Sequence, residues 1–161
     1  MTVATVASRA LAGIDAPEVT VEVHLGPGLP AFHIVGLPDT EVREARDRVR
    51  AALNHARFEF PARRITVNLA PAELPKDSRR FDLPIALGIL AARGHLPRDA
   101  LRGWAILGEL SLDAQFLFLG AGVTSHGVGM VDPRGFRPPW EIVNGLFENS
   151  GLDWRLEYGH R

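Results

Sequence analysis

Residues 83–93, LPIALGILAAR, are the segment that most restricts how this chain can fold. Apolar side chains occur on every side of a helix built from this segment, and such a helix is stable only when other parts of the protein surround it. Asp82 is predicted to cap the N-terminus of the helix, Pro84 is tolerated in its first turn, and Gly94 marks its end. The fold must therefore enclose this helix in its core.

Period-two alternation of apolar and polar residues predicts several strands around that helix. Residues 17–36 are expected to form a β-hairpin, because a valine-rich strand is followed by a Gly/Pro-rich turn and the return strand AFHIVG. Residues 5–14, 63–71 and 104–110 are predicted to be further strands.

Residues 40–55 have the pattern of an amphipathic helix, with Asp39 or Thr40 as its N-cap. Its charged side, which includes Arg43 and Arg48, alternates basic with acidic residues and is interpreted as a solvated helix face. The element order is hairpin, helix, strand, helix, strand. It predicts a mixed α/β sandwich of the α+β kind, in which helices pack on a mixed sheet.

The composition indicates an ordinary globular protein. The chain has 161 residues, of which 46% are hydrophobic and 23% are charged, and no apolar run is long enough to span a membrane. The N-terminus lacks the basic start and continuous apolar core of a secretory signal, and there is no cysteine for a disulfide framework. We therefore expect a cytoplasmic protein.

The charges and histidines indicate no cofactor, metal or strong nucleic-acid site. The formal net charge of −1 cannot drive nonspecific DNA binding through the overall field, although a local basic surface remains allowed. The six histidines never occur at ligand spacing, so no metal-ligating residue is predicted. Residues 120–129 are glycine-rich but do not match GxGxxG between a strand and a helix, and are interpreted as a loop.

ATP hydrolysis by this chain is excluded on the sequence. A phosphate-binding loop of the form GxxxxGK[ST] needs a lysine to reach the β and γ oxygens. The only lysine is Lys76, in LPKDS, and no glycine precedes it in that motif. We therefore predict no ATP-binding residue and no cofactor in this chain.

Three long blocks of the sequence carry a family resemblance. They are SRALAGIDAPEVTVEVHLGPGLPAFHIVGLPDTEVREARDRVRAAL, FEFPARRITVNLAPAELPKDSRRFDLPIALGILAA and LGELSLD. The match covers roughly residues 3–113, and the blocks themselves are long and nearly gapless. They closely resemble the N-terminal domain of the bacterial magnesium-chelatase-like AAA+ family, which includes the ComM and YifB proteins.

The resemblance implies a Lon-protease-domain-like fold for residues 1–113. In the family this domain is followed by an AAA+ ATPase module and a small C-terminal domain. Members of the ComM type are ring-forming, ATP-dependent motors that act on branched DNA during natural transformation. The implied partners are DNA and the AAA+ ring subunits, while ATP and Mg²⁺ are implied only for the ATPase module. The oligomeric state of the present chain does not follow from the resemblance.

After residue 113 the sequence departs from the family pattern. The family continues with a glycine, a strand carrying Arg-Pro and a helix that leads into the ATPase, whereas AQFLFL follows here. We expect residues 114–161 to be a divergent and irregular tail, with a short helix at 139–151 as the exception. A frameshifted or truncated reading frame is the preferred explanation, and a native variant C-terminus is the alternative.

A Lon-type peptidase activity is not predicted. The segment PKDSRRFD is similar to the PKDGPSAG loop of Lon proteases, but alignment from Pro75 puts Arg80 at the position of the nucleophilic serine and Ser78 at a glycine. The lysine that serves as base in Lon lies beyond the GE-containing strand, where this chain has no lysine. No catalytic residue is therefore predicted.

The charged loop at residues 71–82 has two interpretations. In the structural one, Asp82 caps the following helix and the cations are solvated or pair with Asp77. In the functional one, the loop and the preceding strand form a contact surface for DNA or a neighbouring domain. The residues of that candidate surface are Arg63, Arg64, Lys76, Arg79 and Arg80.

The sequence therefore predicts a non-catalytic accessory domain, a fragment of a ComM/YifB-type AAA+ protein. A residual hydrolase and a nonfunctional truncated product are the alternatives.

Overall fold

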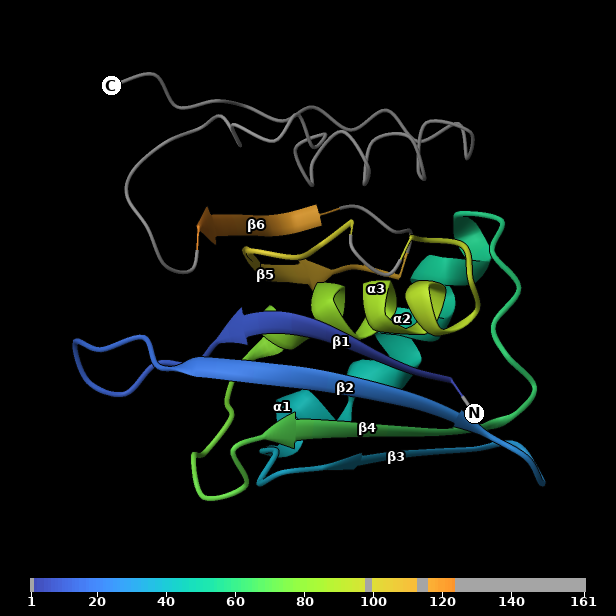
Figure 1. The fold of residues 1–161 in the computed structure, drawn as a ribbon, viewed down its shortest axis with the longest axis horizontal. Helices are drawn as coiled ribbons and strands as arrows, with labels where there is room; N and C mark the ends of the chain where they lie inside the picture. Colours follow the sequence, from blue (N-terminus) through green and yellow to red (C-terminus); the bar gives the residue numbers. More distant parts are fainter. Residues whose placement is uncertain (1, 98–99, 113–115, 124–161) are drawn as a thin grey trace.

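The computed structural model describes residues 2–97, 100–112 and 116–123 and contains one six-stranded sheet with helices packed against it (Figure 1). The strands are β1 (Thr2–Arg9), β2 (Glu18–Gly26), β3 (Ala31–Val35), β4 (Arg64–Ala70), β5 (Trp104–Leu110) and β6 (Phe116–Val123). The helices are α1 (Thr40–Arg43), α2 (Ala45–His55) and α3 (Asp82–Ala92), and a 3-10 turn, η1, covers Arg79–Phe81.

The sheet is mixed, with strand order β3-β4-β2-β1-β5-β6. The pairs β1–β2, β2–β4 and β5–β6 are antiparallel, whereas β3–β4 and β1–β5 are parallel. Helix α3 lies against β1, β2 and β5, and α2 lies beside α3. The predicted α+β class, with helices packed on a mixed sheet, is confirmed.

The predicted hairpin at residues 17–36 is wrong in its pairing, although both of its strands exist. Strand β4 lies between β2 and β3, antiparallel to the first and parallel to the second. The turn residues between β2 and β3 therefore cross over the end of β4 instead of closing a hairpin. Local sequence indicates a reversal of direction there, but the strand that lies between them begins 29 positions after the end of β3, at Arg64–Ala70.

The predicted helix at 40–55 is interrupted at Glu44, where α1 ends and α2 begins. Asp39 is the N-cap of α1, and its carboxylate accepts a hydrogen bond from the Val42 amide at 2.8 Å. The apolar side of α2, including Val49 and Leu53, is buried as the periodicity predicted.

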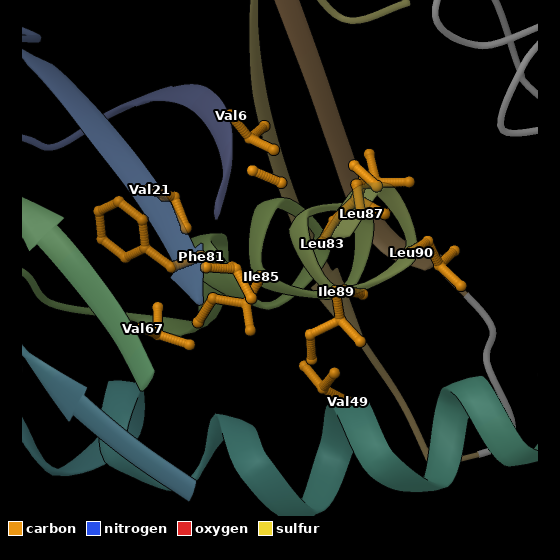
Figure 2. Close-up of a cluster of buried hydrophobic side chains, with 14 of the residues drawn as sticks. Val6, Val21, Val49, Val67, Phe81, Leu83, Ile85, Leu87, Ile89 and Leu90 are labelled. Atoms are coloured by element: carbon orange, nitrogen blue, oxygen red, sulfur yellow. The ribbon is translucent and has the colours of Figure 1, made fainter. Parts of the chain in front are cut away.

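Helix α3 is the centre of the core, and every one of its residues is buried. Figure 2 shows its side chains between the strands and α2, with Val21 and Val67 of the sheet on one side and Val49 of α2 near Ile89. The alternate residues of β2 and β4 that face α3 are buried, while their other side is only partly covered. The prediction that this all-apolar helix is enclosed is confirmed.

The expectation of an irregular segment after residue 113 is wrong for residues 116–123. They form β6, which pairs with β5 from Trp104↔Val123 to Leu110↔Phe116 with an irregularity at Glu109/Leu110. The apolar residues there do not alternate with polar ones clearly enough to predict a strand. The strand is identified by its pairing with β5. The helix predicted at 139–151 lies outside the described residues. Within the described part, no helix is long and apolar enough to cross a membrane.

Gly88 permits the close approach of α3 to β2. A Cβ atom at this position would lie 2.5 Å from Cγ2 and 3.3 Å from Cβ of Val23. We predict that Gly88→Ala lowers the free energy of unfolding by about 1–3 kcal/mol through overpacking. This loss is expected even though alanine has a higher helix propensity than glycine, by about 1 kcal/mol.

Urea denaturation of Gly88→Ala in two backgrounds tests this explanation. Val23→Ala removes the methyl groups that the new Cβ would meet, so the same substitution should cost less there, or should stabilise the protein. An equal cost in both backgrounds would show that the close contact is not the cause.

Candidate functional site

The segment between β4 and η1 is held against the chain that precedes α1. The Asp39 amide donates to the Lys76 carbonyl at 2.9 Å, and the Lys76 amide donates to the Leu37 carbonyl at 3.2 Å. These bonds place residues 71–78 at the C-terminal end of β4, beside the N-terminus of α3. The loop that the sequence singles out is therefore an ordered part of the fold.

Lys76 is fully buried, with 0% of its surface exposed. Its ammonium group donates to the Pro71 carbonyl. Burial lowers the pKa of Lys76, while the nearby Glu73 carboxylate acts in the opposite direction. The sequence interpretation of Lys76 as a solvated cation or a surface contact is wrong, because its side chain is turned inward onto the loop's own backbone.

A buried ion pair connects the starts of two helices. Arg48 Nε donates to Asp82 Oδ2 at 2.7 Å and Arg48 Nη2 donates to Asp82 Oδ1 at 3.1 Å. Arg48 Nη2 also donates to the Glu41 carbonyl at 2.6 Å, and the Leu110 amide donates to Asp82 Oδ2 at 3.3 Å. The bidentate pair thus joins α2, α3, the end of β5 and α1.

Two sequence interpretations are corrected here. Asp82 is not a helix cap: the N-cap position of α3 is Phe81, without a side-chain cap hydrogen bond, and the Asp82 carboxylate bonds Arg48 instead. Arg48 is not on a solvated face, since it is 9% exposed. Burial raises the pKa of Asp82, and the hydrogen bonds and charge of Arg48 oppose that rise. The two residues are 34 positions apart, so local patterns could not pair them.

Ser78 and Arg80, the positions that align with the Lon catalytic loop, bond each other. Arg80 Nε donates to Ser78 Oγ at 2.7 Å, and the Arg80 amide lies 3.5 Å from the same oxygen. Arg80 Nη2 also lies 3.9 Å from Asp77 Oδ1. Arg79 pairs with Glu109 on β5 at 3.0 Å. The Ser78 hydroxyl therefore accepts from a permanent cation, an environment that does not remove its proton.

The candidate contact surface does not form one patch. Arg79 and Arg80 belong to η1, which follows the loop that leaves the C-terminal end of β4 and directly precedes α3. Arg63 and Arg64 precede or begin β4, at its opposite end. The two groups lie beyond opposite ends of β4, a strand of seven residues that is roughly 20 Å long. These residues were predicted to form one surface because they flank the same strand, but they lie at different ends of it.

A cavity of about 420 Å³ lies at the Arg63 end of the molecule. Arg63 and Arg93 line it together with Glu59, and Arg93 Nη2 lies 3.9 Å from the Glu59 carboxylate. Arg93 follows α3 and is 30 positions from Arg63, so no local pattern could indicate that it belongs to this group. Arg63, Arg64 and Arg93 are all exposed. No group of three or more metal-ligating side chains occurs among the described residues.

We predict that Asp82→Asn lowers the free energy of unfolding by about 3–5 kcal/mol, because it removes the buried negative charge bonded to Arg48 and leaves only the exposed Glu44 carboxylate, 3.7 Å away. The matched control is Asp47→Asn, which removes a carboxylate paired with Arg46 at 3.1 Å, with both side chains more than half exposed. Its cost should be below about 1 kcal/mol. Urea denaturation measures both, and similar costs would contradict a dominant role for the buried pair.

Lys76 should make stability depend on pH. Its pKa is lower in the folded chain than in the unfolded chain, so between these two values the unfolded chain binds more protons. The contribution of Lys76 to the free energy of unfolding should therefore rise with pH between these two pKa values and level off above the ordinary lysine pKa. Denaturation of Lys76→Met across the same pH range should lack this rise. Parallel curves for the two proteins would refute the prediction.

Comparisons with known proteins match most of the described chain. A family model described as subunit ChlI of Mg-chelatase matches residues 21–120, well over half of the chain and into β6. Competence protein ComM of Haemophilus influenzae is 56% identical over 115 residues, which are 71% of this chain and 23% of that protein. An uncharacterized protein of Escherichia coli, YifB, is 51% identical over 112 residues, 70% of this chain and 22% of that protein.

A more distant relative, an uncharacterized protein of Mycobacterium tuberculosis, is 42% identical over 108 residues. The chain spans less than a quarter of the length of these curated relatives. The match of the family model and the identity to ComM and YifB lead to one conclusion: this chain belongs to the magnesium-chelatase-like family of subunit ChlI.

Proposed function

We propose that this chain is a non-catalytic accessory domain of a ComM/YifB-type AAA+ protein that acts on DNA. The observation that carries the proposal is the 56% identity over 115 residues to a protein named for competence. ATP hydrolysis belongs to another part of such a protein, because the present chain has no GxxxxGK[ST] loop.

The contacts of the loop at 71–82 support a structural role for it. Lys76 bonds the loop backbone, Asp82 is occupied by Arg48, and the Ser78 hydroxyl accepts from Arg80. A nucleophile needs a neighbouring base that is free to accept a proton. In this loop the described polar groups are instead used in bonds that fix the start of α3.

The exposed arginines at the opposite end of β4 are the best candidates for DNA contact. Arg63 and Arg93 line the cavity with Glu59 as the acidic neighbour, and Arg64 follows Arg63 at the start of β4. Arginine suits phosphate contacts because its guanidinium donates in a planar fork. The net charge of −1 means that binding rests on this local group and weakens steeply with salt.

The DNA proposal is tested by fluorescence anisotropy with labelled duplex DNA at several salt concentrations. Arg63→Ala/Arg64→Ala should weaken binding and reduce the slope of log K against log salt by about 2. The control, Arg43→Ala/Arg46→Ala, removes the same charge from the exposed side of α1 and α2. Equal losses in the two variants, or no binding by the unaltered chain, would overturn this part of the proposal.

The non-catalytic assignment is tested separately with ATPase and peptidase assays on the purified chain. We expect no turnover above the buffer blank, and no change in Ser78→Ala or Arg80→Ala. Turnover that either substitution abolishes would instead establish the alternative, a residual hydrolase that uses this loop.

A further inference from the structure

Strand β3 forms one edge of the sheet, and its outer side lies open (Figure 1). The Ala31 amide donates to the Arg63 carbonyl at 3.4 Å, so the odd-numbered residues of β3 direct their backbone groups toward β4. The N–H and C=O groups of Phe32 and Ile34 therefore point outward. In the described part of the chain, no hydrogen bond occupies these outward groups.

Several of the usual protections of a sheet edge are missing from β3, although at five residues it is the shortest strand of the sheet. Natural edge strands carry lysines, an internal proline, a bulge or an inward charge that discourages further pairing. The strand AFHIV has none of these. Exposed apolar side chains occur on it and just beyond its ends, namely Leu29 at 82%, Val35 at 47% and Leu37 at 55% exposed. An open backbone with apolar flanks is suited to pairing with another strand.

We propose that β3 pairs in antiparallel orientation with β3 of a second copy of this chain, about a two-fold axis at His33. Phe32 of one copy then lies opposite Ile34 of the other, and the outward backbone groups of both residues are satisfied in both copies. The two-fold axis also brings the Leu29 end of one strand to the Leu37 end of the other. The exposed leucines on the two sides of β3 thereby cover each other.

A second copy fits this edge because the edge is complementary to itself. A two-fold interface uses the same patch on both partners, so any charge near its axis would meet its own like charge. The described edge has no such charge: β3 carries no acidic residue, lysine or arginine. The side chain of His33 is exposed on the open face, and its backbone is directed to β4. His33 therefore meets His33 of the second copy as a non-hydrogen-bonded pair, with Cα atoms about 4.5 Å apart.

Sedimentation over a range of concentrations tests the pairing. The unaltered chain should associate to a dimer, and His33→Arg should raise the dissociation constant at least about tenfold, because two guanidinium groups would face each other at the axis. His24→Arg is the matched control, since His24 and His33 both pair with Thr66 and lie on the same face, but His24 is in the interior strand β2. It should dimerise as the unaltered chain does.

A chain that stays monomeric at every concentration would overturn the proposal. So would a His33→Arg variant that dimerises normally. Thermal unfolding of both variants checks that neither substitution disrupts the monomer.

Cysteine substitution gives a second, positional test, because the natural chain contains no cysteine. A Cα separation of about 4.5 Å lies within the range that a disulfide spans. His33→Cys should therefore form a covalent dimer under mild oxidation, whereas His24→Cys should remain monomeric on a non-reducing gel. Equal crosslinking of the two variants would place the dimer contact elsewhere and refute pairing through β3.

Discussion

The ion pair between Arg48 and Asp82 is the interaction on which the arrangement of the helices depends. Its partners come from α2 and the first residue of α3, the Glu41 carbonyl and the Leu110 amide also bond the pair, and the Glu44 carboxylate lies 3.7 Å from Arg48 Nη1. Arg48, Asp82, the Glu41 carbonyl and the Leu110 amide come from four different elements, namely α2, α3, α1 and β5. Because both charges are removed from water, the desolvation cost is offset only while all of these bonds form together. The pair thus fixes the relative positions of the helices more than it adds net stability.

The apolar core and this polar cluster hold α3 at two different points along its length. Near its middle, α3 approaches β2 closely at Gly88, where a methyl group would overlap Val23. At its start, Asp82 fixes its position against α2 and the end of β5. Apolar packing is tolerant of small shifts, whereas a bidentate pair is not. A specific position for α3 therefore follows from combining both kinds of contact.

The parts of the structure that local pattern determines could be predicted from the sequence, and long-range pairings could not. Period-two alternation located β2 and β4, and the all-apolar segment located α3. The insertion of β4 between β2 and β3 depends on partners far along the chain, so a hairpin was the expected result. The same limit affected the site: Asp82 had the sequence context of a helix cap, but its actual partner, Arg48, is 34 positions away.

The two proposed contact surfaces are compatible in one assembly. Ala31 pairs with Arg64, so the basic end of the molecule adjoins the start of β3. In an antiparallel β3 pair, the start of one strand lies beside the end of the other. The Arg64 groups of the two copies therefore lie at opposite ends of the joined sheet, where their like charges are far apart and screened. Pairing through β3 would thus leave both basic ends accessible and double the number of phosphate contacts on one particle.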